Sequence, residues 1–198
     1  MRILPLFRFV PLLALAALVL PAFPADLTVE GIPNFHQVNA RLFRGGQPSP
    51  AAWPKLAALG VETVIDLCRE EEHSTAAEAR AVEAAGMQYV SFPMNGFETP
   101  TAAQIERVLG LVDAGDTVFV HCKLGVDRTG TVVAVYRIAR EHWANQQALD
   151  EAESLGLHWY EHGMKRFILA YRVRDPAPVE VAPASDSTLT PAAQPEVH

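Results

Sequence analysis

Apolar and polar positions change along the chain in blocks that favour strands and helices in turn. Short runs rich in β-branched and aromatic residues are typical of buried strands, and they cover 41–44, 61–67, 89–92 and 117–120. Apolar residues at helical spacing follow in segments that span about 50–59, 75–85, 101–114, 129–143, 146–155 and 160–174. The pattern predicts an α/β fold: a central, mostly parallel sheet of four to five strands with helices on both faces.

Capping signals mark where several of these helices begin. Thr75 with Glu78, and Thr101 with Gln104, have the spacing of a capping box. Ser49, directly before a proline, marks a third start. Each start follows a predicted strand, so we expect these helices to connect parallel strands through right-handed crossovers.

The two ends of the chain differ in composition from its centre. Residues 1–25 combine two arginines, an apolar stretch of about 12 residues and small residues near Ala25, which is the pattern of a signal peptide. An uncleaved membrane anchor is the alternative, although the stretch is short for a span. Residues 176–198 are rich in Pro, Ala, Ser and Thr and are predicted to be disordered. We therefore expect one folded domain over 26–175, exported to the periplasm or otherwise outside the cytoplasm, monomeric and not stably inserted in a membrane.

Charge excludes one broad class of function. Without the leader's two arginines, the 16 basic residues fall to 14 against 23 acidic ones, a net charge of −9. Such a chain is a poor general binder of nucleic acid, which requires many lysines and arginines. Any anion site must be made locally, by a loop. Neither a Walker motif nor a dinucleotide fingerprint occurs, so we expect no cofactor and no metal.

The chain has only two cysteines, Cys68 and Cys122, which is too few for a disulfide-stapled scaffold. They could form one structural disulfide, or one of them could be a reactive thiol. The surroundings of Cys122 favour the second interpretation. It directly follows a predicted strand, and Arg128 comes six residues later at the start of a predicted helix. Ligands of parallel sheets bind beyond the carboxyl ends of the strands.

This loop has the groups that phosphoryl transfer needs. A thiol beside cations at a helix N-terminus can have a pKa of roughly 3.5–7.5, so Cys122 is the candidate nucleophile toward phosphorus. Gly125 permits a positive φ, and the planar fork of Arg128 matches two phosphate oxygens. The Thr129 hydroxyl can donate to the sulfur when a phosphoenzyme breaks down, and His121 either orients the loop from behind or simply packs. Backbone N–H groups can surround the phosphate at Lys123, Leu124, Gly125, Val126, Asp127 and Arg128.

The segment from His121 to Gly130 resembles the Cys-x5-Arg-Thr/Ser signature of the protein tyrosine phosphatase superfamily, in its dual-specificity branch. Residues 43–48, 135–138 and Trp143 extend the likeness to bacterial exported, plant and fungal atypical members over about 35–172. The resemblance implies a metal-independent phosphatase that forms a cysteinyl-phosphate and acts on phosphotyrosine and phosphoserine or phosphothreonine of proteins. In some relatives a second cysteine protects the oxidised nucleophile, a role that Cys68 could have here.

One part of the family pattern is missing. Members usually carry a general-acid Asp some thirty residues before the nucleophile, but the stretch 91–100 contains none. Glu98 is the nearest carboxylic acid and our first candidate, or else a surface carboxylate. Asp127 is the rival, although it could instead hold Arg128 or contact a substrate or water.

Other readings of the same residues stay open. Lys123 and Asp127 within the loop are compatible with a phosphoinositide or inositol phosphate phosphatase. A rhodanese-like sulfurtransferase also places a cysteine in such a loop, and a phosphate-binding pseudophosphatase would explain the missing acid. Near the predicted site, Arg44 is expected to bond structurally or to contact substrate at the rim. His158 and His162 are four residues apart, and we interpret them as helix surface rather than as metal ligands, because no third ligand pattern accompanies them.

Overall fold

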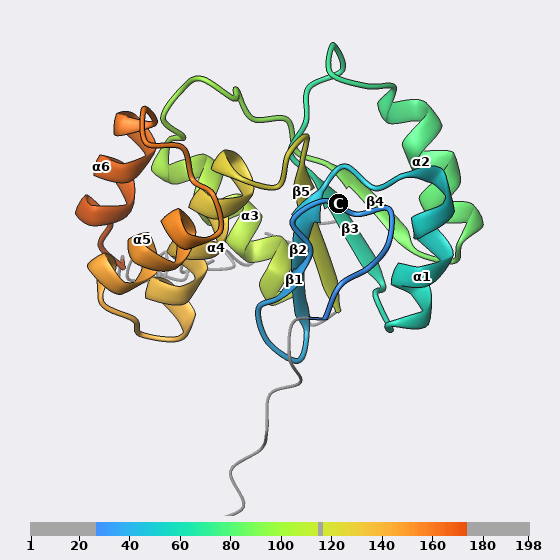
Figure 1. The fold of residues 1–198 in the computed structure, drawn as a ribbon, viewed down its shortest axis with the longest axis horizontal. Coiled ribbons are helices and arrows are strands. Elements are labelled where there is room, and N and C mark those ends of the chain that lie inside the picture. Colours follow the sequence, from blue (N-terminus) through green and yellow to red (C-terminus); the bar gives the residue numbers. More distant parts are fainter. Residues whose placement is uncertain (1–26, 115–116, 174–198) are drawn as a thin grey trace, which may run out of the picture.

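The computed structural model describes residues 27–114 and 117–173 (Figure 1). The predicted leader and tail both lie outside these described residues, so those two predictions stay predictions. Within the described residues, no helix combines the length and the apolar character that a bilayer crossing requires.

A five-stranded, mostly parallel sheet forms the centre of the fold, as predicted. The strands are ordered β1-β2-β5-β3-β4, and only β1 runs antiparallel to its neighbour. β5 therefore lies in the middle, between β2 and β3. The strand bounds are β1 His36–Gln37, β2 Leu42–Gly46, β3 Thr63–Asp66, β4 Gln88–Ser91 and β5 Val118–Cys122.

Helices cover both faces of this sheet (Figure 1). α1 and α2 lie on one side, and α3, α4, α5 and α6 on the other. A 3₁₀ turn, Pro50–Ala52, leads into the first helix. The helix bounds are α1 Trp53–Ala58, α2 Thr75–Ala84, α3 Ala102–Asp113, α4 Asp127–Arg140, α5 Asn145–Ser154 and α6 His162–Ala170.

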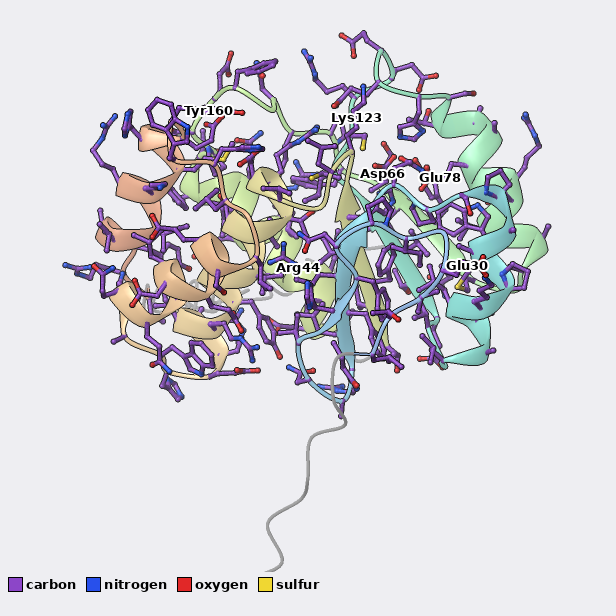
Figure 2. The ribbon with its side chains drawn as sticks, viewed as in Figure 1. Glu30, Arg44, Asp66, Glu78, Lys123 and Tyr160 are labelled. Carbon is purple, nitrogen blue, oxygen red and sulfur yellow. The ribbon has the colours of Figure 1, made fainter. Side chains whose placement is uncertain are left out.

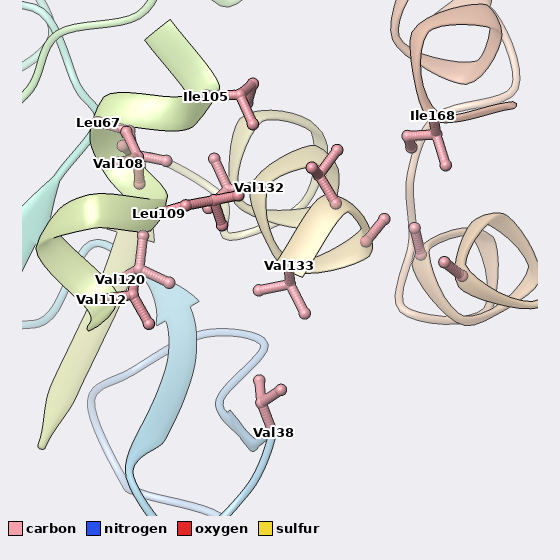
Figure 3. Close-up of a cluster of buried hydrophobic side chains, with 14 of the residues drawn as sticks. Val38, Leu67, Ile105, Val108, Leu109, Val112, Val120, Val132, Val133 and Ile168 are labelled. Atoms are coloured by element: carbon pink, nitrogen blue, oxygen red, sulfur yellow. The ribbon is translucent and has the colours of Figure 1, made fainter. Parts of the chain in front are cut away.

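Alternation along the strands divides the core into two apolar clusters. On β5, Phe119 packs with α1 and α2, whereas Val118, Val120 and Cys122 pack on the opposite face. Figure 3 shows that second cluster, where side chains of α3, Val120 and the α4 residue Val132 meet. The same alternation that builds the core thus turns Cys122 toward α4.

Of the three predicted caps, the one at Thr101 is confirmed, while Ser49 precedes the 3₁₀ turn at Pro50 but its side chain makes no cap hydrogen bond. Thr101 and Gln104 form the predicted capping box at the start of α3. At α2 the N-cap is Ser74, whose hydroxyl accepts from the Ala77 N–H. Glu78 does not cap that helix, because its carboxylate is buried and faces His73 and His121.

Candidate active site

Two sheet strands and one helix position the predicted loop. β5 ends at Cys122, which is paired in register with Gly46 at the end of β2, and α4 begins at Asp127. Figure 2 places Lys123 at this carboxyl edge of the sheet. Val126, the N-cap of α4, makes no side-chain cap hydrogen bond. The positive end of a 14-residue helix therefore opens onto the loop.

The loop lies so close to β2 that no side chain fits at Gly125 in the loop or at Gly46 in the strand. Gly125 has a φ of +71°, as predicted, and a Cβ there would lie 2.3 Å from the Gly45 carbonyl carbon. A Cβ on Gly46 would lie 2.9 Å from the backbone of Leu124. Close backbone packing against the phosphate loop therefore explains Gly46, whereas a Cβ on Gly45 would meet the Ile32 side chain at 2.7 Å.

The carbonyl groups of the loop are tied to β2 and the residues that follow it. The Lys123 carbonyl accepts from the Gln47 N–H at 3.1 Å, and the Gly125 carbonyl accepts from the guanidinium of Arg44. Since the C=O and N–H of a trans peptide point in opposite directions, the amides that follow these carbonyls point away from β2. This orientation agrees with the predicted amide cradle.

Arg44 is a buried cation beneath the loop. Its side chain is 1% exposed, and burial lowers its pKa to about 10, while the nearby Cys122 sulfur acts in the opposite direction. A group with that pKa stays protonated at neutral pH. Of the two expectations for Arg44, structural bonding is therefore the one that the structure supports.

Arg128 is held by a carboxylate that the sequence analysis did not single out. Its two terminal nitrogens donate to Glu72 at 2.6 and 2.7 Å, and Nη1 also donates to the carbonyls of Leu67 and Met94. The hydrogen bonds from Arg128 lower the pKa of Glu72 to about 2. Because Glu72 binds the fork end-on, the edge formed by Nε and the outer N–H of Nη2 remains for an anion.

A hollow of about 320 Å³ brings together five of the predicted residues, Cys122, Lys123, Leu124, Asp127 and Arg128. Cys122, at 2% exposure, lies at its base. Gly125 and Val126, which were also predicted to contribute amides, are not among the residues that line the hollow. The lining residues are Arg69, Glu72, Gly96, Phe97, Cys122, Lys123, Leu124, Asp127, Arg128, His158 and Tyr160.

Glu98, our first candidate for the general acid, does not line this pocket. Its side chain is exposed and borders a separate small hollow with Asn95 and Gln104. The chain turns after Gly96 so that Phe97 borders the pocket, and Glu98 is directed to the neighbouring hollow. Of the two interpretations of Glu98, this geometry supports the surface carboxylate and not the general acid.

Asp127, the rival candidate, does line the pocket, and its partner is His158. The Nδ1 atom of His158 lies 3.0 and 2.9 Å from the two carboxylate oxygens, and the His158 backbone N–H donates to Oδ1 at 3.0 Å. Asp127 therefore does not hold Arg128. His158 lies in the segment before α6, so its interpretation as helix surface is wrong.

Thr129 is fully buried behind the loop. Its hydroxyl has no hydrogen-bond partner among the described residues, so the predicted bond to the Cys122 sulfur is not formed in this structure. The predicted role of Thr129 in phosphoenzyme breakdown stays a prediction.

His121 belongs to a buried polar cluster under the loop. Its Nε2 lies 2.8 Å from Glu78, and the Asp66 carboxylate takes contacts from His73 at 2.9 Å and from the Tyr89 hydroxyl at 2.7 Å. Figure 2 shows Asp66 and Glu78 on the α2 side of Lys123. Asp66, Glu78 and His121 are the right residue types for a metal, with candidate ligand atoms within 4.8 Å of one another. Both carboxylates already accept hydrogen bonds from protein groups, Asp66 from the Cys68 N–H and the Tyr89 hydroxyl, and Glu78 from Gln47. Among the described residues the His121 ring nitrogens make no hydrogen bond, so its role in orienting the loop stays a prediction.

Cys68 and Cys122 are both free thiols. β3 and β5 are neighbours, as the redox hypothesis required, and Cys68 follows the end of β3. Burial raises the pKa of the Cys68 thiol, and the Asp66 carboxylate acts in the same direction. A protonated, buried Cys68 has little intrinsic reactivity, so its redox role remains a prediction.

Comparison with known proteins agrees with this geometry. A family model described as "DSP-PTPase phosphatase fused to NAD+ Kinase" matches residues 27–162. The dual specificity protein phosphatase TpbA of Pseudomonas aeruginosa is 27% identical over 125 residues, which cover 62% of this chain and 55% of TpbA. The chain thus spans about half the length of that relative. The inositol diphosphatase DSP3 of Arabidopsis thaliana is 29% identical over 150 residues, 71% of this chain and 70% of DSP3.

Two crystal structures have the same fold. That of P. aeruginosa TpbA superposes with a TM-score of 0.64 at 24% identity, covering 74% of this chain and 89% of the TpbA chain. The core catalytic domain of the PP-IP phosphatase SIW14 from S. cerevisiae has a TM-score of 0.64 at 20% identity, covering 73% and 89%.

Proposed function

Since the chain belongs to the dual-specificity-type family of protein tyrosine phosphatase-like enzymes, we propose that it is a phosphoric monoester hydrolase with Cys122 as its nucleophile. The observation that carries the proposal is the meeting of Cys122, Arg128 and the uncapped start of α4 in one pocket. A thiolate there is stabilised by the helix dipole and by Arg44 beneath the loop.

The chemistry runs through two displacements. The Cys122 sulfur attacks phosphorus, and the substrate's P–O bond breaks to leave a cysteinyl-phosphate. Water then attacks phosphorus, and the S–P bond breaks to release phosphate and regenerate the thiolate. Arg128 and the loop amides compensate the charge of the phosphoryl group, so the proposed route uses neither a metal ion nor a cofactor.

The rim of the pocket favours a phosphate carried by an aromatic or apolar group, such as phosphotyrosine. Phe97 is 86% exposed, Leu124 54% and Tyr160 50%, and all three line the pocket. A phosphotyrosine ring can pack on such side chains. We propose phosphotyrosine, together with phosphoserine and phosphothreonine, on exported proteins as the physiological substrates.

An inositol phosphate phosphatase is the second candidate. Arg69 and Lys123 border the pocket, and the relative DSP3 is an inositol diphosphatase. Against this, Glu72 and Asp127 place two carboxylates in the same lining, where a polyanion would meet repulsion. The charge pattern therefore ranks this substrate class second.

One experiment tests both the reaction and its substrate class. Purified protein and its Cys122→Ser variant are assayed for phosphate release from p-nitrophenyl phosphate, phosphotyrosyl peptides and inositol pyrophosphates. We expect release from the first two, and a loss of about 10⁴-fold or more in the variant because the covalent route is removed. Equal rates for both proteins would refute the cysteine mechanism, and release confined to inositol pyrophosphates would favour the second candidate.

We also propose that the mature protein is exported and acts outside the cytoplasm. The support is the signal-peptide pattern of residues 1–25. N-terminal sequencing of protein from the periplasmic fraction should give a start between Phe23 and Asp26. An intact Met1 on membrane-bound protein would contradict this proposal.

A further inference from the structure

The pocket contains a paired acid and base that the two displacements above do not yet use. Asp127 and His158 both line it, together with Cys122. We propose that His158 is the proton donor to the leaving group and that Asp127 positions it. This inference rests on the proposed function, because it assigns a proton transfer within that reaction.

Three contacts fix His158 relative to the phosphate loop. Asp127, the first residue of α4, accepts the His158 backbone N–H at 3.0 Å and faces Nδ1 with both oxygens at 2.9 and 3.0 Å. Facing a carboxylate, Nδ1 is assigned the proton. Nε2 is then the ring nitrogen directed away from Asp127.

A second element holds the ring plane. The imidazole stacks on the Tyr160 ring, with centroids 4.9 Å apart and an interplanar angle of 18°. Tyr160 lines the same pocket, and the His158 side chain is 34% exposed. The ring is thus fixed at one edge and on one face, yet it remains accessible to a bound phosphate ester.

The pairing favours His158 over Asp127 as the donor. Both carboxylate oxygens of Asp127 face the His158 ring, and Oδ1 also accepts its backbone N–H, so Asp127 is placed to position His158 rather than to reach a leaving group. The imidazole keeps Nε2 on its opposite edge for proton transfer, a role that histidine commonly has in catalysis. The other charged or titratable groups facing this place are Arg69, Glu72, Lys123 and Arg128 across the pocket, with Tyr160, Glu161 and His162 on the adjoining segment.

The proton balance closes over one turnover. As the P–O bond breaks, its electron pair stays on the leaving oxygen, which takes the proton from Nε2 of His158. In the second step water attacks phosphorus and gives a proton to the now neutral Nε2. The S–P electron pair returns to Cys122, Asp127 stays ionised throughout, and the net reaction is ester plus water to alcohol plus phosphate.

The test compares two leaving groups in matched variants. His158→Asn should lower kcat/KM for phenyl phosphate and a phosphoserine peptide by about 10²–10³-fold, but for p-nitrophenyl phosphate by less than about tenfold. Its kcat/KM should also lose the decline toward alkaline pH that an essential protonated His158 causes. Asp127→Asn, which removes the carboxylate that positions the ring, should show a smaller loss with the same dependence on the leaving group. His162→Asn, which changes a nearby histidine, should match the unmodified protein in its kcat/KM for each substrate and in its pH profile.

Other results would overturn the inference. An unchanged leaving-group dependence and pH profile in His158→Asn would exclude His158 as the donor. If Glu98→Gln, and not His158→Asn, reproduced the selective loss, the proton would come from Glu98. In either case Cys122→Ser would still abolish activity if the proposed function is right, so the two failures are distinguishable.

Discussion

The two ends of α4 each carry a partly buried arginine, and the partners of the two side chains differ. At the start, Arg128 binds one carboxylate, Glu72, end-on. Near the other end, Arg137 donates to two carboxylates, Glu141 and Glu151, using Nε as well as both terminal nitrogens.

Arg137 has further partners that complete its enclosure. Its Nη1 donates to the Val38 carbonyl at 3.1 Å, and its guanidinium stacks over the Trp143 ring at 4.4 Å. Each nitrogen of Arg137 is thus engaged, whereas Arg128 keeps one edge toward a pocket. The comparison teaches that a guanidinium with an unused edge and a fixed opposite edge indicates a binding site, while a fully bonded one indicates scaffold.

The strongest test exchanges each arginine for lysine. Arg128→Lys should lower kcat/KM for p-nitrophenyl phosphate by about 10²–10³-fold, because lysine cannot supply the two-pronged contact to the transferring phosphoryl group. Arg137→Lys should change it by less than about threefold. Steady-state kinetics of both variants check this, and similar losses in the two would erase the distinction between the ends of α4.

The next test removes the group that orients Arg128. Glu72→Gln keeps the size of the side chain but weakens the charged hydrogen bonds that fix the fork. We expect kcat/KM to fall by about 10- to 100-fold, since small displacements of a positioning group are costly in catalysis. Measuring kcat and KM of Glu72→Gln at fixed pH tests this expectation. A variant as active as the unmodified protein would show that the Leu67 and Met94 carbonyls alone orient Arg128.

Near the C-terminal end of α4, substitution of Arg137 should lower the stability of the protein rather than its activity. Arg137→Met removes the cation between two carboxylates and should lower the free energy of unfolding by roughly 1–3 kcal/mol. Activity at 25 °C should stay close to normal, because Arg137 does not line the pocket. Urea denaturation followed by tryptophan fluorescence measures the effect. An unchanged midpoint would mean that the Arg137 network contributes no net stability.

Local pattern and spacing were enough to predict the parallel sheet, the capped start of α3 at Thr101, and the thiol–arginine loop with its Gly125 turn. The helix predicted from Pro50 begins as a 3₁₀ turn, and α1 starts at Trp53. β1 was missed because two residues carry no periodic signal, and its pairing with β2 is set by the chain reversal between them. Such features depend on tertiary context rather than on the local run of residues.

The missed site residues have the same explanation. Glu72 lies in a run of three glutamates that looks like a solvated surface, and its partner is 56 positions away. His158 is 31 positions from Asp127. A pairing over such separations leaves no mark on either local sequence. The unmatched Asp127 beside Arg128 was the one available signal, because a carboxylate within a phosphate loop requires a partner.

The smallest effect concerns acid stability at the Arg128 end. The pKa of Glu72 is about 2, below its ordinary value near 4.5, because Arg128 donates to it. A depressed folded-state pKa contributes stability that is fully present above about pH 5 and is lost as the pH falls toward 2. Because Glu72 lines an open pocket where solvent screens the pair, we expect this contribution to be about 1 kcal/mol or less. Urea unfolding of the unmodified protein and Glu72→Gln from pH 7 to pH 2 should therefore show a small difference that vanishes at the acid end. A difference that is constant over this range would mean that the Glu72 charge does not stabilise the fold, leaving its role in orienting Arg128 to be judged by kinetics alone.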